Sequence, residues 1–191
     1  MWSSDWNCGV HGAVYPLQPP RKPSKEGLTT ALKDARVPVW VPWPLPLDWL
    51  VTGFLSAGDE RTGSRASVVA ISGPALLGGP ADLLVIAEEP GVGLGAAMAG
   101  LEGPDPGLEC FNDPPHAKVA AYGHPVPLWV VEAAPDRAAY VGEAMGNWLW
   151  MVLWPARSGA LMLDQPELCD LREPGMQLDL PFGAFCPRLG Q

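Results

Sequence analysis

The sequence predicts an α+β fold that is mostly antiparallel β with one or two short helices. Short apolar runs rich in Val, Leu and Trp recur at hairpin spacing, and 23 prolines and 22 glycines interrupt them. Prolines and glycines placed in this way are typical of tight turns between strands. At 191 residues, 48% of them hydrophobic, the chain is long enough to bury the core of one domain.

The first 20 residues are predicted to form a truncated zinc-ribbon-like knuckle and a linker, ahead of a single β-rich domain at residues 21–191. Cys8 and His11 are separated by two residues, which is the spacing of one knuckle of a zinc ribbon. A closed zinc site needs four ligands, and the other three cysteines are single and far apart. The pair is therefore either half of a metal site or a free cysteine beside a surface histidine.

Residues 24–36 are the best helix candidate in the chain. Ser24 is placed to cap the N-terminus, Glu26 falls in the first turn and Lys33 in the last, as the helix dipole favours. Two leucines four residues apart share one face, which is expected to pack against the rest of the domain.

The sequence from residue 37 onward predicts a succession of strands. The expected strands are 37–41, 47–57, 66–72, 81–88, 118–122, 127–132, 138–144, 148–154 and 159–163, with one more inside 164–172. The run 148–154 is apolar at alternate and intervening positions alike, which predicts a central strand buried on both faces. Residues 37–57 carry a single charge, but their four prolines forbid a continuous helix, so no membrane span is expected.

A glycine-rich segment after the expected strand 81–88 is the candidate cofactor site. The backbone amides of Gly91, Gly93 and Gly95 are placed to cradle a phosphate ahead of a short helix. The spacing departs from the dinucleotide-binding and P-loop patterns, and the acids at 88–89 would repel an anion at the loop entrance. Tight packing, in which small residues let two backbones approach, is the favoured interpretation.

The remaining acids and histidines form no catalytic motif. Glu132 and Glu143 offer carboxylates and His116 and His124 offer bases, but nothing in the sequence brings them together. The Ser-Gly-Pro at 72–74 is interpreted as a turn and not as a nucleophile elbow. Whether the protein is an enzyme is therefore left open.

The net charge of −9 is unevenly distributed along the chain. Residues 1–36 carry five bases against three acids, for +2, whereas the rest carries seven bases against 18 acids, for −11. An acidic body repels a phosphate backbone, so no nucleic-acid binding is expected. The four cysteines show no disulfide framework and no secretory signal precedes them, so we expect reduced thiols in a cytoplasmic protein.

Several stretches rich in Trp, Pro and Gly are distinctive. They lie at residues 6–12, 15–19, 37–46, 88–100, 103–107, 127–129, 148–150, 154–155 and 170–172. In them the chain resembles, nearly end to end, a domain-of-unknown-function family of high-GC Gram-positive bacteria. The resemblance implies an N-terminal zinc ribbon in which a Cys-x-x-Cys pair comes first and Cys8 and His11 supply the second pair. This sequence lacks the first pair, so zinc is expected only in a form that carries it. Some family members carry a phosphotransacetylase label, which no site in this sequence supports.

The sequence is most consistent with a cytoplasmic, non-catalytic binding or regulatory module that has a protein partner. The half zinc ribbon and the lack of a converging catalytic set favour this hypothesis. The alternative is a small acyl- or phosphoryl-transfer enzyme that uses residues 91–100 as an anion cradle. A third interpretation is a structural homo-oligomer that associates through exposed edges rich in Trp and Pro.

Overall fold

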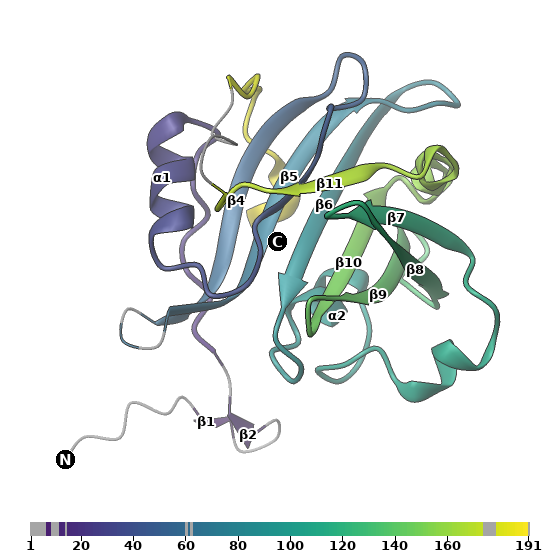
Figure 1. Ribbon diagram of the computed structural model, residues 1–191, viewed down its shortest axis with the longest axis horizontal. Helices are drawn as coiled ribbons and strands as arrows, with labels where there is room; N and C mark the ends of the chain where they lie inside the picture. Colours follow the sequence, from purple (N-terminus) through teal and green to yellow (C-terminus); the bar gives the residue numbers. More distant parts are fainter. Residues whose placement is uncertain are drawn as a thin grey trace.

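The protein is mostly antiparallel β-structure with a few short helices, as the sequence predicts (Figure 1). The computed structural model describes residues 7–8, 12–13, 15–59, 61, 63–173 and 179–190. The strands are β1 (Asn7–Cys8), β2 (Gly12–Ala13), β3 (Trp40–Pro42), β4 (Leu50–Asp59), β5 (Gly63–Pro74), β6 (Pro80–Glu88), β7 (Ala117–Ala121), β8 (His124–Val131), β9 (Ala138–Ala144), β10 (Asn147–Trp154) and β11 (Glu167–Asp170). The helices are α1 (Lys25–Lys33) and α2 (Leu94–Ala99), with 3₁₀ helices η1 (Leu108–Asn112), η2 (Ala156–Asp164) and η3 (Pro187–Gly190).

Helix α1 confirms the helix predicted at residues 24–36, although it ends earlier, at Lys33. Ser24 is its N-cap, and the Ser24 hydroxyl accepts the backbone N–H of Gly27 at 3.0 Å. Leu28 is buried, so the apolar face of the helix packs against β4. In the described part of the chain, no helix is long and apolar enough to cross a membrane.

Nine strands form one curled sheet in the order β3-β11-β7-β8-β9-β10-β6-β5-β4. Neighbouring strands are antiparallel except for β11 and β7. The sheet bends into a half-barrel (Figure 1), and β3, at one edge of the sheet, packs against β5 and β6. The segment ahead of β3 also reaches the start of β5, where the Arg36 N–H donates to the Ser64 carbonyl at 3.1 Å.

The two faces of the sheet bury separate cores, because side chains alternate along each strand. On β10, Leu149, Met151 and Leu153 belong to the inner core, which is enclosed by the half-barrel and α1. The intervening Trp150 and Val152 belong to the outer core, which α2 and the C-terminal segment cover. The prediction of a central strand buried on both faces is therefore confirmed for β10.

The predicted strand at 159–163 is wrong. These residues form part of η2, and its buried positions are spaced by three, as in Ser158 with Leu161 and Gly159 with Met162. A period of three is that of a 3₁₀ helix, whereas a strand would alternate. Gly159 also lies against Tyr140, which leaves no room for a Cβ at this position. The other strands are confirmed within three residues at each boundary.

The outer edge of β4 is covered by two segments from opposite ends of the chain. Residues 16–21 form hydrogen bonds with the C-terminal half of β4, where Arg21 and Phe54 exchange two backbone hydrogen bonds of 2.8 and 3.1 Å. Residues 181–186 form hydrogen bonds with the N-terminal half of β4, where the Cys186 N–H donates to the Thr52 carbonyl at 2.8 Å. This second segment carries Phe185, Cys186 and η3 to one end of the outer face.

The predicted N-terminal knuckle lies mostly outside the described residues. β1 and β2 pair as a two-stranded antiparallel sheet, with Cys8 opposite Gly12. His11 is not among the described residues, so the zinc pair stays a prediction.

Candidate functional site

At one end of the sheet, three residues on neighbouring strands lie directly opposite one another and face the outer side. Ser72 of β5 and Trp154 of β10 are the two cross-strand partners of Asp82 on β6. Asp82 and Glu88 are six residues apart, so their side chains lie on the same face of β6. Helix α2 covers this face at Glu88, and cavities open beside Asp82.

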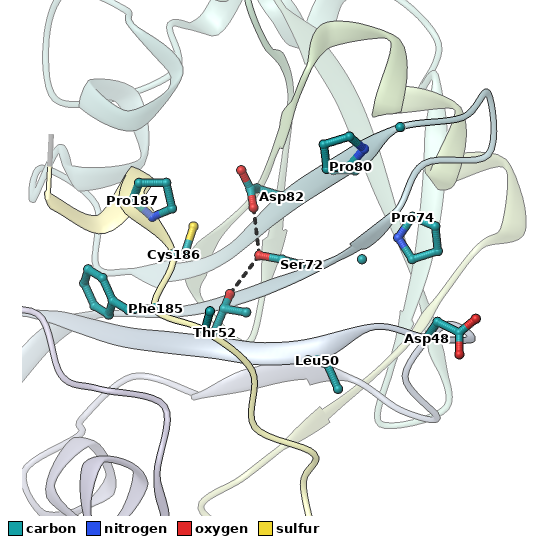
Figure 2. Close-up of a pocket in the computed structure, with 14 residues that line it drawn as sticks. Asp48, Leu50, Thr52, Ser72, Pro74, Pro80, Asp82, Phe185, Cys186 and Pro187 are labelled. Atoms are coloured by element: carbon teal, nitrogen blue, oxygen red, sulfur yellow. Dashed lines mark hydrogen bonds between the residues drawn. The ribbon is translucent and has the colours of Figure 1, made fainter.

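One cavity on this face, here called the Ser72 cavity, has a volume of about 660 Å³. Its walls come from β4, from both arms of the β5–β6 hairpin and from the C-terminal segment (Figure 2). The walls are mostly apolar and include Leu50, Pro74, Pro80, Phe185 and Pro187. An apolar pocket with a few convergent polar groups is the usual composition of a binding site.

A chain of hydrogen bonds runs along the floor of the Ser72 cavity (Figure 2). The Ser72 hydroxyl donates to Asp82 Oδ1 at 2.7 Å, and Thr52 Oγ lies 2.9 Å from Ser72 Oγ. A hydroxyl has one proton, and Ser72 gives its proton to the carboxylate, so Thr52 is the donor to Ser72. Arg188 Nε donates to the other carboxylate oxygen of Asp82 at 3.3 Å. The floor therefore offers acceptor oxygens, and a ligand must bring the donors.

The thiol in this cavity is poorly suited to nucleophilic chemistry. Cys186 is 1% exposed, and burial raises the pKa of its thiol, although Arg188 and the Ser72 hydroxyl act in the opposite direction. A thiol with a raised pKa stays protonated at neutral pH and reacts slowly. Among the described residues that line the cavity there is no histidine. The arrangement can bind a ligand, and the group that accepts the Ser72 proton is the Asp82 carboxylate, which Arg188 also contacts.

The glycine-rich segment predicted as an anion cradle already holds two carboxylates of the protein. The Gly91 N–H donates to Asp105 Oδ1 at 2.9 Å, and the Gly95 N–H donates to Glu88 Oε2 at 3.1 Å. Gly93 is the N-cap of α2, with a positive φ. Gly95 lies directly against the Trp150 ring. Both amide binding and the close packing expected of this segment are thus present, with side chains of the protein as the anions.

Glu88 is the most unusual acid in the described residues. It is 0% exposed, and burial raises its pKa to about 7, although the backbone N–H groups of Gly95 and Leu94 favour its charged form. Its second oxygen, Oε1, has no hydrogen-bond partner among the described residues. Because α2 and Trp150 close over it, Glu88 acts as an internal support of α2.

The other candidate acids and histidines have local structural surroundings. Glu89 pairs with Arg65 at 3.1 Å, and Glu143 accepts the Gly146 N–H at 3.2 Å. His116 Nδ1 accepts the Val130 N–H at 3.3 Å. Glu132 and His124 are exposed, and none of these residues lines the Ser72 cavity. Within the described residues, no group of three or more His, Cys, Asp or Glu is arranged to hold a metal ion.

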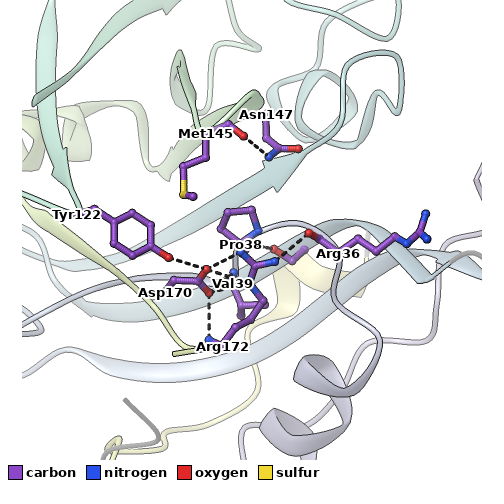
Figure 3. A network of polar contacts seen from close by, with 9 residues as sticks. Arg36, Pro38, Val39, Tyr122, Met145, Asn147, Asp170 and Arg172 are labelled. Atoms are coloured by element: carbon purple, nitrogen blue, oxygen red, sulfur yellow. Dashed lines mark hydrogen bonds and ion pairs between the residues drawn. The ribbon is translucent and has the colours of Figure 1, made fainter. Parts of the chain in front are cut away.

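A second polar network is structural (Figure 3). The buried Asp170 accepts the Val39 N–H at 3.0 Å, the Tyr122 hydroxyl at 3.1 Å and Arg172 Nη2 at 2.7 Å. Burial alone would raise the pKa of Asp170, but the Arg172 and backbone donors hold it below its usual value. These bonds tie β3, β11 and the β7–β8 turn together, and they close the half-barrel.

Fold and site together define a β half-barrel domain with an apolar cavity whose floor presents acceptor oxygens. By sequence, the chain belongs to a family of unknown function, DUF6758, whose family model matches residues 1–189. The match agrees with the nearly end-to-end resemblance noted above. Comparisons with curated proteins and with solved structures gave no match.

Proposed function

We propose that the protein is a non-catalytic binding module that holds an extended apolar segment of a partner protein in the Ser72 cavity. The distribution of exposed apolar side chains carries this proposal. Of eleven large apolar residues exposed in the described part of the chain, two line the cavity and three more lie within two residues of a lining residue. They are Leu47, Leu50, Leu76, Leu77 and Phe185. Such a concentration is typical of protein interaction sites.

The chemistry of the cavity floor agrees with a peptide occupant. Asp82 and the hydroxyl oxygens accept hydrogen bonds, and an extended peptide presents backbone N–H donors at regular intervals. Its apolar side chains would contact Leu50 and Phe185. A phosphoryl-transfer role for Gly91–Gly100 would require an anion to displace Glu88 and Asp105 from the amides they occupy.

Panning a phage library of short random peptides on the purified protein tests the proposal. Enriched peptides are synthesised with a fluorescent label, and their dissociation constants are measured by anisotropy. We expect them to be rich in apolar residues and to bind Phe185→Ala at least about tenfold more weakly, because aromatic anchors dominate such interfaces. Leu50→Ala should weaken the same peptides.

Leu108→Ala is the matched control, because Leu108 is 85% exposed and lies on η1, outside the cavity. It should bind the peptides as the unmodified protein does. Thermal melts of all variants establish that each is folded. Failure to enrich any peptide would falsify the proposal, as would peptides that bind Phe185→Ala and Leu50→Ala with unchanged affinity.

A further inference from the structure

A second cavity adjoins the Ser72 cavity on the other side of Asp82. This Trp154 cavity has a volume of about 330 Å³. Pro80 and Asp82 line both cavities, and the second is completed by Asp136, Trp154, Pro155, Arg157 and Arg188. The register explains the arrangement, since Ser72 and Trp154 flank Asp82 on neighbouring strands. A segment that leaves the Ser72 cavity across Asp82 therefore enters the Trp154 cavity.

Three arginines gather around Trp154, although the chain carries a net charge of −9. The guanidinium carbons of Arg137 and Arg188 lie 4.8 and 5.4 Å from the centre of the Trp154 ring. Arg137 is engaged by two bonds to Asp136, at 2.7 and 3.3 Å. Arg188 uses only its Nε toward Asp82, so its two Nη groups have no hydrogen-bond partner among the described residues. Stacking on the tryptophan fixes these side chains in place.

Arg157 differs from the other two arginines, because it forms no ion pair or hydrogen bond with any described residue. It is exposed at the start of η2 and lines the Trp154 cavity. Its guanidinium reaches the β5–β6 hairpin near Gly79. A guanidinium offers five N–H donors in a planar fork, which matches a carboxylate. The cavity thus holds donors from Arg157 and Arg188 that no described residue accepts.

We propose that the Trp154 cavity recognises an acidic side chain, Asp or Glu, of the segment bound in the Ser72 cavity, through Arg157 and the Nη groups of Arg188. This inference rests on the proposed function. Clusters of arginine bind acidic motifs of a peptide, whereas the C-terminal carboxylate of a peptide is usually bound by a nest of backbone N–H groups. Asp82 and Asp136 face the same cavity, so a singly charged carboxylate fits better than a doubly charged phosphate.

The test uses the enriched peptides in a double-mutant cycle. Each peptide is compared with a version in which its Asp or Glu is replaced by Asn or Gln, on the unmodified protein and on Arg157→Gln. We expect Arg157→Gln to bind the acidic peptide about tenfold more weakly and to bind the amide version with unchanged affinity, because only the first forms the ion pair. Added salt should weaken the acidic peptide on the unmodified protein only.

Lys118→Gln is the control, since it removes the same charge from an exposed position on β7. Equal binding of the acidic peptide to Arg157→Gln and to the unmodified protein would overturn the inference while leaving the proposed function intact. Two further results would overturn it. One is a peptide that binds only with a free C-terminal carboxylate, and the other is a phosphoserine version that binds more tightly through Arg157. If no peptide is enriched, both proposals fail.

Discussion

The carboxylate of Glu88 accepts the backbone N–H of Leu94 at 2.7 Å, so a buried acid on β6 holds the start of α2. This contact is made by a group that titrates near neutral pH, because burial raises the pKa of Glu88 to about 7. Packing of α2 on the outer face is therefore coupled to proton binding.

Glu88 should make the protein less stable as the pH rises. Its pKa is about 7 in the folded state and 4.5 as the ordinary value, so folding favours the protonated form. The stabilisation is complete below pH 4.5 and is lost as the pH rises through 7. The loss amounts to about 3 kcal/mol of unfolding free energy. Urea unfolding followed by tryptophan fluorescence at several pH values measures it. Glu88→Gln should remove this part of the pH dependence, and an unchanged profile in that variant would contradict the prediction.

Asp170 should matter far more for stability than an exposed acid in an ion pair. Asp170→Asn leaves Arg172 without its buried carboxylate, and we expect a loss of about 3 kcal/mol. Asp179, whose side chain is fully exposed beside Lys25, provides the comparison, and Asp179→Asn should leave the stability nearly unchanged. Chemical unfolding of both variants gives the two values. Similar losses would show that Asp170 does not close the half-barrel.

Gly95 should tolerate no side chain. A Cβ at this position would overlap the indole ring of Trp150, which is completely buried. Gly95→Ala should destabilise the protein by about 1–3 kcal/mol, because either α2 or the indole ring has to move. Gly190→Ala places its Cβ in open space and should be nearly neutral. Thermal unfolding measures the difference, and intrinsic fluorescence reports any displacement of Trp150.

Zinc binding is the prediction that follows from Cys8 and His11. We expect about one zinc per chain in a form extended upstream by the Cys-x-x-Cys pair, since four ligands complete the site. Elemental analysis of the purified protein measures the metal, and Cys8→Ser in the extended form should lose it. Zinc retained by Cys8→Ser, or absent from the extended form, would exclude this pair as ligands.

Local sequence signals account for most of the elements. The cap at Ser24 located α1, and the apolar run at 148–154 gave both the strand and its burial on two faces. The strand predicted at 159–163 is wrong for a physical reason. Leu161 and Met162 are adjacent and both buried, and neither the alternation expected of a half-buried strand nor the composition of the segment predicts this burial. The curl of the sheet depends on pairing between segments that are distant in the chain, so no short stretch of the sequence predicts it.

The candidate site was not predicted from the sequence for the same reason. The Ser-Gly-Pro sequence at Ser72 favours a turn, and only the register of β5 with β6 places Asp82 beside Ser72. Arg188 is 106 residues from Asp82 in the chain. The available signal was an acid within the apolar run 81–88, where a charged group needs partners. Glu88, in the same run, was assigned to the loop entrance, although it is completely buried.

The covering of β4 by both ends of the domain has a consequence for its biogenesis. Residues 181–186 complete the edge of β4 near Thr52, and the same segment leads to Arg188, which contacts Asp82. A ribosome releases these residues more than a hundred positions after β4 itself. A nascent chain thus exposes an unfinished strand edge until residues 181–186 emerge, and the Ser72 cavity is complete only once Phe185 and Cys186 have joined it.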